Sequence, residues 1–145
     1  MAVRFPSIEY FIALKDQMSA EQARFRRLGF IDTTFGVGVI QNGLSRNFVL
    51  AFEVFELKNV DEVGQLDLAQ LDFSIEGEFS VWSDMLENIK RHGEADTAHD
   101  LNTLAHFGEA LKINYVDPEG HDKLYRFMES IQEFFDLSSK LEVTF

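Results

Sequence analysis

The histidines are the first side chains in this sequence that invite a chemical role. His92, His99 and His106 recur every seven residues, and Asp96 and Asp100 lie between them. On a helix, seven residues rise by about 10 Å, which is too far for two ligands of one metal ion. Helical metal sites prefer spacings of three or four residues. We therefore expect surface histidines here and no metal site.

Two sets of carboxylates could act as acids or bases. Glu53 interrupts the most apolar stretch, where it either enters a cavity with a raised pKa or, as the pattern favours, points to solvent. Glu76 and Glu78 flank Gly77, and such a carboxylate pair could act in general acid–base catalysis. The simpler explanation is that acidic residues are favourable near the positive end of the dipole of the helix predicted to follow. Residues 36–38 lack the third glycine of a dinucleotide site. We expect no catalytic residue and no cofactor.

Arg24, Arg26 and Arg27 form the densest group of positive charge. Residues 1–30 carry five basic and three acidic residues, whereas the whole chain has a net charge of −12. This negative charge argues against nucleic acid as a partner, because phosphates would be repelled over most of the surface. The three arginines could contact an anionic head group, such as a phosphate or the diphosphate of CoA. The alternative is a solvated helix face.

The bulk composition predicts a single domain over residues 1–145. The chain has no linker-like segment and no cysteine, and a domain of this size buries about 70% of the surface that its unfolded form exposes. The first residues lack the apolar run of a signal peptide, so we expect a cytoplasmic protein. The 15 phenylalanines suit the wall of an apolar cavity and equally suit an ordinary core.

Hydrophobic periodicity and turn residues predict the elements that must position these side chains. The predicted helices are one capped by Ser7, one from about Ser19 to Leu28 ended by Gly29, one capped by Ser80 and ended at His92-Gly93, a short one capped by Asp96, and a last one over about Pro118–Leu137. The predicted strands are Phe30–Ile40, Asn47–Leu57, a short edge strand within Lys58–Gln70, Leu71–Glu76 ended by Gly77, and Leu111–Tyr115.

This order predicts an α+β fold. Asn42-Gly43 is a hairpin turn signal, and strands joined by tight turns predict an antiparallel meander of four or five strands with helices on one face. The side chains expected to point toward the helices are Phe48, Leu50, Phe52, Phe73 and Ile75.

The stretch Leu71–Ile89 (LDFSIEGEFSVWSDMLENI) carries a family resemblance. A strand, a glycine and a helix with Trp82 and Leu86 are followed by Leu101–Leu104 and by the strand Ala110–Ile113. Together these resemble the sterol-carrier-protein-2 (SCP2) family from about Ile8 to Phe135. The family commonly has a Gly-Asp pair after that last strand, where this chain reads NYVDPEG. Sterol specificity is therefore not implied.

The resemblance implies non-enzymatic binding or transfer of a fatty acid, acyl-CoA, isoprenoid or sterol-like lipid. The ligand would occupy an apolar cavity between the sheet and the last helix. The residues expected to line it are Phe35, Val37, Phe52, Trp82, Leu86, Leu111, Phe127, Ile131 and Phe135. The alternative is an interaction or scaffold domain with a closed cavity that assists an enzyme acting on lipids or quinones. Transient membrane contact and a homodimer remain open.

Overall fold

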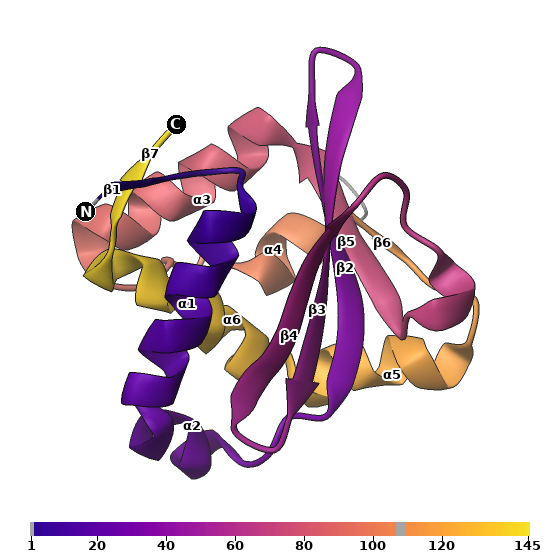
Figure 1. The fold of residues 1–145 in the computed structure, drawn as a ribbon, viewed down its shortest axis with the longest axis horizontal. Coiled ribbons are helices and arrows are strands. Elements are labelled where there is room, and N and C mark those ends of the chain that lie inside the picture. The colour runs from indigo at the N-terminus through magenta and orange to yellow at the C-terminus, as the bar shows by residue number, and fades with distance from the viewer. Residues whose placement is uncertain (1, 107–109) are drawn as a thin grey trace.

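Five strands form the central sheet in the spatial order β4-β3-β2-β5-β6 (Figure 1). The computed structural model describes residues 2–106 and 110–145. The strands are β2 (Thr33–Gln41), β3 (Leu44–Glu53), β4 (Glu56–Val63), β5 (Phe73–Glu78) and β6 (Leu111–Asn114). The predicted hairpin turn joins β2 to β3, with positive φ at both Asn42 (55°) and Gly43 (77°). The predicted α+β class and five-stranded sheet are confirmed.

The predicted meander is wrong, because β5 pairs in parallel with β2 and not with β4. After β4 the chain passes a 3-10 turn, η1 (Leu68–Gln70), and returns to the other side of β2. Asp72 holds this return in place. Its amide donates to the carbonyl of Thr34 at 2.8 Å, and its carboxylate accepts from the Thr33 hydroxyl at 2.7 Å. Asp72 is far from Thr33 and Thr34 in the sequence, so the hydrophobic periodicity of neighbouring residues does not predict these contacts.

The helices gather mainly on one side of the sheet, where α1, α3 and α6 lie (Figure 1). The six helices of the described residues are α1 (Ile8–Ala20), α2 (Gln22–Leu28), α3 (Phe79–His92), α4 (Leu101–Ala105), α5 (Pro118–Arg126) and α6 (Met128–Asp136). A 3-10 turn, η3 (Leu137–Lys140), follows α6. Two short strands that the sequence did not predict, β1 (Ala2–Arg4) and β7 (Glu142–Thr144), pair in parallel. Among the described residues, no helix combines the length and apolarity that crossing a bilayer requires.

The helix-facing side of the sheet is apolar, as predicted. Phe48, Leu50, Phe52, Phe73 and Ile75 are all buried. The Phe48 ring lies 4.8 Å from that of Phe11 in α1, and the Phe52 ring lies 5.0 Å from that of Phe134 in α6. The strand registers inferred from alternation are therefore confirmed.

Gly77 lies inside β5 and does not break it. It pairs with Val39 of β2 and Leu111 of β6. A Cβ there would lie 2.6 Å from Cδ2 of Leu111 and 3.1 Å from the carbonyl oxygen of Ala110, so the glycine permits close packing. Because β5 extends to Glu78 and α3 begins at the next residue, Ser80 lies in the first turn of α3 and is not its cap.

Two other predicted caps are also wrong. Ser19 lies inside α1, which continues to Ala20, and α2 begins only after Glu21. The cap of α4 is Asp100, whose carboxylate accepts from the amide of Thr103 at 2.7 Å, and not Asp96. Gly29 does end α2, with φ of 96°.

The predicted last helix is two helices, since Phe127 leaves the helical region with φ −108° and ψ 12°. The bend lets α5 pack on the chain just before β5, while α6 runs along the inner face of the sheet. At the α5 contact a Cβ on Gly120 would overlap the carbonyl oxygen of Asp72 and lie 2.8 Å from its carbonyl carbon. The apolar pattern continues across the bend, so periodicity alone does not reveal it.

Candidate functional site

The side chains predicted to line an apolar cavity all lie in the core between the sheet and the helices. None of the nine is more than 7% exposed. They come from β2, β3, α3, β6, α6 and the bend at Phe127. The tertiary structure thus gathers in one layer residues that lie up to a hundred positions apart in sequence.

Within this layer the rings pack against one another. Phe35 stacks between Phe52 and Phe73, with ring centroids 5.6 and 4.8 Å away. The Trp82 ring lies 5.7 Å from that of Phe135, and its Nε1 donates to the carbonyl of Gly38 at 3.1 Å. Four pockets in the described residues have volumes from 250 to 480 Å³, and none of the nine residues lines any of them. In this structure the rings of the layer therefore contact one another.

Phe127 marks the point where this layer comes nearest to solvent. It is 7% exposed, and its ring centroid lies 6.1 Å from that of Phe30, which is 61% exposed. The guanidinium of Arg126 lies 6.0 Å from the Phe127 ring. Phe30 was not singled out from the sequence. The sequence feature that could have identified Phe30 is its position, directly after the glycine that ends a predicted helix.

The three arginines differ in their surroundings. Arg24 is half-buried and forms ion pairs with Glu133 of α6 and, at 3.4 Å, with Glu21. Arg26 is exposed, and its guanidinium lies 5.1 Å from the Phe55 ring. Arg27 is exposed. Arg24 therefore joins α2 to α6, whereas Arg26 and Arg27 face solvent.

The described residues contain no group of three metal-binding side chains close enough to share an ion. His99 Nδ1 lies 2.7 Å from Oδ1 of Asp96. Hydrogen bonds from His99 and Asn88 lower the pKa of Asp96 to about 2. His92 lies in the last turn of α3. Glu53 is exposed, as its solvent-facing interpretation predicts.

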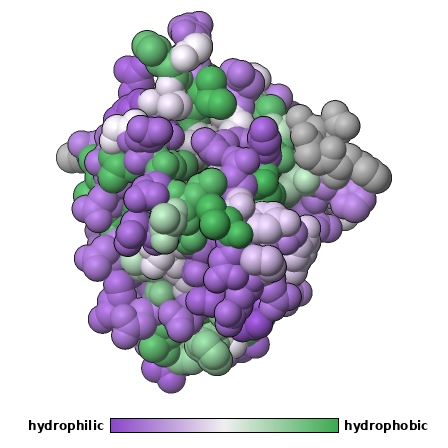
Figure 2. Space-filling view, turned by 90° about the vertical axis from the view of Figure 1, so that its right-hand side faces the viewer, coloured by the Kyte–Doolittle hydropathy of each residue, from purple (hydrophilic) through white to green (hydrophobic). Residues whose placement is uncertain are grey.

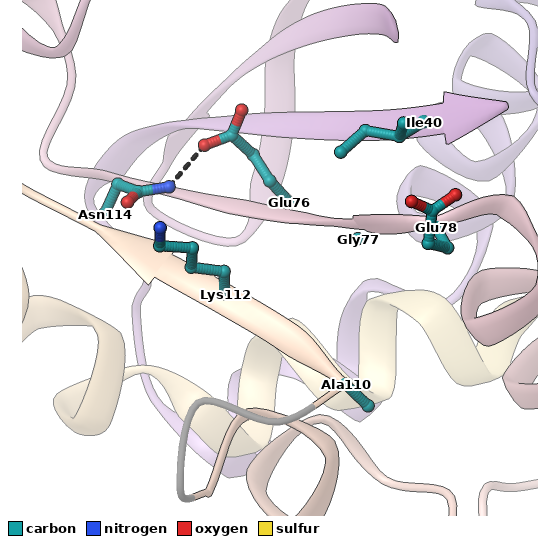
Figure 3. A pocket seen from close by; sticks show the side chains of 7 residues that line it. All are labelled: Ile40, Glu76, Gly77, Glu78, Ala110, Lys112 and Asn114. Atoms are coloured by element: carbon teal, nitrogen blue, oxygen red, sulfur yellow. Dashed lines mark hydrogen bonds between the residues drawn. The ribbon is translucent and has the colours of Figure 1, made fainter. Parts of the chain in front are cut away.

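The opposite, outer face of the sheet holds the largest of the four pockets, with a volume of 480 Å³ (Figure 3). Figure 2 shows the side of the molecule that lies on the right in Figure 1, where apolar residues gather in the middle and hydrophilic residues surround them. The pocket is lined by Ile40, Glu76, Gly77, Glu78, Ala110, Lys112 and Asn114. Glu76 and Glu78, the carboxylates on either side of Gly77, therefore both line a pocket. Glu76 is half-buried and Glu78 is exposed.

Comparison with known proteins identifies the fold. No protein-family model and no curated protein matches the chain. The solution structure of a conserved hypothetical protein from Thermus thermophilus, described as possibly a sterol carrier protein, matches with a TM-score of 0.71 and 12% identity over 95% of this chain and 90% of that one. A crystal structure of sterol carrier protein 2 matches with a TM-score of 0.69 and 13% identity over 93% and 97% of the two chains. This chain has the sterol-carrier-protein-2 fold.

Proposed function

We propose that this protein binds or transfers an apolar small molecule, such as a fatty acid, acyl-CoA, isoprenoid or sterol-like lipid, without catalysing a reaction. The observation that carries the proposal is the sterol-carrier-protein-2 fold, with an aromatic layer between the sheet and α6. The ligand would occupy this layer among Phe35, Val37, Phe52, Trp82, Leu86, Leu111, Phe127, Ile131 and Phe135.

The energetics of such binding are favourable once the layer opens. Each buried methylene contributes about 0.8 kcal/mol, so a chain of about 16 carbons supplies about 12 kcal/mol before the costs of association. The rings of the layer already contact one another, so a ligand must first break contacts such as the one between Phe52 and Phe134. Part of the free energy gained by burying the ligand offsets the loss of these contacts. The ligand chain then replaces those contacts, and binding is promiscuous.

The bend between α5 and α6 is the proposed opening. Phe127 leads into the layer and Phe30 covers it from outside, at 6.1 Å between ring centroids. Arg26 and Arg27 are exposed in the last turn of α2, and Phe30 follows shortly after the end of this helix. They are the proposed contacts for an anionic head group or an anionic membrane surface. The proposed role of Arg24 is mainly structural, because it forms an ion pair with Glu133 of α6.

Native mass spectrometry of the purified protein, followed by titration with a fluorescent fatty acid, tests the proposal. A bound lipid and saturable binding, with quenching of Trp82, the single tryptophan, are the expected results. Saturation is expected at tens of micromolar, about −6 to −7 kcal/mol.

The second candidate function is an interaction domain that assists an enzyme acting on lipids or quinones. The ring contacts within the layer favour it, since Phe35 stacks between Phe52 and Phe73 and the Trp82 ring lies 5.7 Å from that of Phe135. No copurifying lipid and no saturable binding in the same titration would support this alternative and exclude the carrier function.

A further inference from the structure

Helix α6 forms one wall of the aromatic layer. Ile131, Phe134 and Phe135 point into the core, and all three are fully buried. Away from the sheet, α6 packs against α2 and α4. Consecutive residues of a helix point about 100° apart, so the neighbours Gln132 and Glu133 reach different elements. The bonds that these two residues make determine how α6 can move relative to the sheet.

On the α4 side, hydrogen bonds to backbone amides hold α6. The Gln132 side chain accepts from the amide of Leu101 at 2.7 Å and donates to the Asp136 carboxylate at 2.9 Å. Asp136 is buried and also accepts from the amide of Ala95 at 3.2 Å. These bonds join α6 to the segment between α3 and α4. Because salt screens buried groups only weakly, we expect this side to hold at any ionic strength.

On the α2 side, an ion pair holds α6. Nε of Arg24 donates to Oε1 of Glu133, and Nη1 of Arg24 lies 3.4 Å from Oε1 of Glu21. Glu21 also accepts from the side-chain amide of Gln17 at 2.7 Å and lies 3.9 Å from Nζ of Lys140. The side chains of Arg24 and Glu133 are 24% and 25% exposed. An ion pair that reaches solvent is weakened by salt, so the two sides of α6 differ in their response to ionic strength.

We propose that the Arg24–Glu133 ion pair is a latch for the aromatic layer. When the pair breaks, α6 turns away from α2 about its α4 side, and the layer opens beside Phe30. Phe127, at the start of α6, lies 6.1 Å from Phe30 between ring centroids, so this side leads to the proposed opening. Arg24 keeps a partner when Glu133 leaves, because Glu21 lies at the start of α2 itself. The inference rests on the proposed lipid-binding function and adds the contact that controls ligand entry.

Hydrogen exchange tests the latch in the absence of any ligand. In Arg24→Gln and in Glu133→Gln, the amides of α6 should exchange about three- to fivefold faster than in the wild type, as expected for the loss of a partly exposed ion pair. Amides of α3 in the same sample are the reference, so a global loss of stability is recognised. Raising NaCl from about 20 mM to about 500 mM should accelerate exchange of α6 in the wild type and leave both variants unchanged.

Arg46→Gln is the matched control for these measurements. Arg46 also pairs with a glutamate, Glu62, but this pair joins β3 to β4. Its loss should leave the exchange of α6 unchanged. All samples are kept at one pH, because Glu133 also raises the pKa of Asp136.

Uptake of an uncharged probe tests whether the latch controls entry. A pyrene-labelled fatty alcohol has no charge for Arg26 and Arg27 to attract, so stopped-flow uptake reports the opening alone. Uptake should be about three- to fivefold faster in Arg24→Gln and Glu133→Gln, and the double variant should be no faster than either, because both changes remove one interaction. Saturable binding with unchanged uptake and unchanged exchange of α6 would overturn the latch. Faster exchange of α6 without saturable uptake by any variant would instead overturn the lipid-binding function, and with it the control of entry.

Discussion

Nε1 of Trp82 donates a buried hydrogen bond of 3.1 Å to the carbonyl oxygen of Gly38, which fastens α3 to β2. Trp82→Phe keeps an aromatic ring near Phe135 but removes the donor and leaves unfilled volume. We expect the free energy of unfolding to fall by about 1–3 kcal/mol. Urea unfolding followed by circular dichroism measures this, and an unchanged midpoint would show that the bond contributes nothing.

Gly120 is expected to tolerate no side chain. A Cβ there would overlap the carbonyl oxygen of Asp72, and backbone cannot yield as a flexible side chain does. Gly120→Ala should therefore destabilise the protein by about 2–4 kcal/mol, as overpacking at a buried backbone contact does. Gly64→Ala is the matched control, since a Cβ at Gly64 meets nothing within 4 Å. Equal Tm values for the two variants would contradict the close approach of α5 to β5.

Asp136 should make stability depend on pH. Burial raises its pKa to about 6, although Gln132 and the amide of Ala95 donate to it and thereby oppose the shift, while nearby Glu133 and Glu94 add to it. The unfolded chain binds this proton with a pKa of about 3.9, so the folded state holds it more tightly. The resulting stabilisation is complete below about pH 4 and is lost as the pH rises through about 6.

Asp136→Asn removes this proton equilibrium and keeps the shape of the side chain. The difference in unfolding free energy, wild type minus Asp136→Asn, should decrease by about 1–2 kcal/mol from about pH 4 to about pH 7.5. Urea titrations of both proteins over this range provide the measurement. A difference that stays constant with pH would mean that Asp136 titrates like an exposed carboxylate.

Phe30 should control access to the proposed lipid layer. Phe30→Ser removes the ring that covers Phe127, so stopped-flow uptake of a fluorescent fatty acid should become faster by a factor of about 3–10, which corresponds to about 1 kcal/mol in the barrier. Tyr125→Ser is the control, because Tyr125 is 60% exposed, close to the 61% of Phe30, and its ring packs edge-to-face against His121 instead of Phe127. Equal uptake rates for the two variants would place the opening elsewhere.

Charge reversal should distinguish recognition by the arginines from their structural role. Arg26→Glu together with Arg27→Glu should weaken acyl-CoA by about tenfold and leave a neutral sterol unaffected. Arg24→Glu should instead lower Tm, since it places a carboxylate beside Glu133 and Glu21. Equal weakening of charged and neutral ligands by the double variant would show that Arg26 and Arg27 act through folding.

Features that depend on neighbouring residues could be predicted from the sequence. The alternation in Phe48, Leu50 and Phe52 predicted the buried face of β3, since successive side chains of a strand point to opposite sides. Asn42-Gly43 predicted the hairpin because few residues accept positive φ. The pattern over Leu71–Ile89, together with Leu101–Leu104 and Ala110–Ile113, also predicted the fold through its resemblance to the sterol-carrier-protein-2 family.

Features that depend on residues far apart in the sequence could not be predicted and became known from the three-dimensional structure. The parallel pairing of β2 with β5 joins residues 35–40 to residues 73–78, and the close packing at Gly77 involves Leu111 of another strand. Neither contact contributes to local periodicity. The same holds for the aromatic layer: composition supplies the rings, but whether they pack together or line a cavity depends on how closely α6 approaches the sheet. That distance is set by the sum of many weak contacts across the whole chain, which no short stretch of sequence encodes.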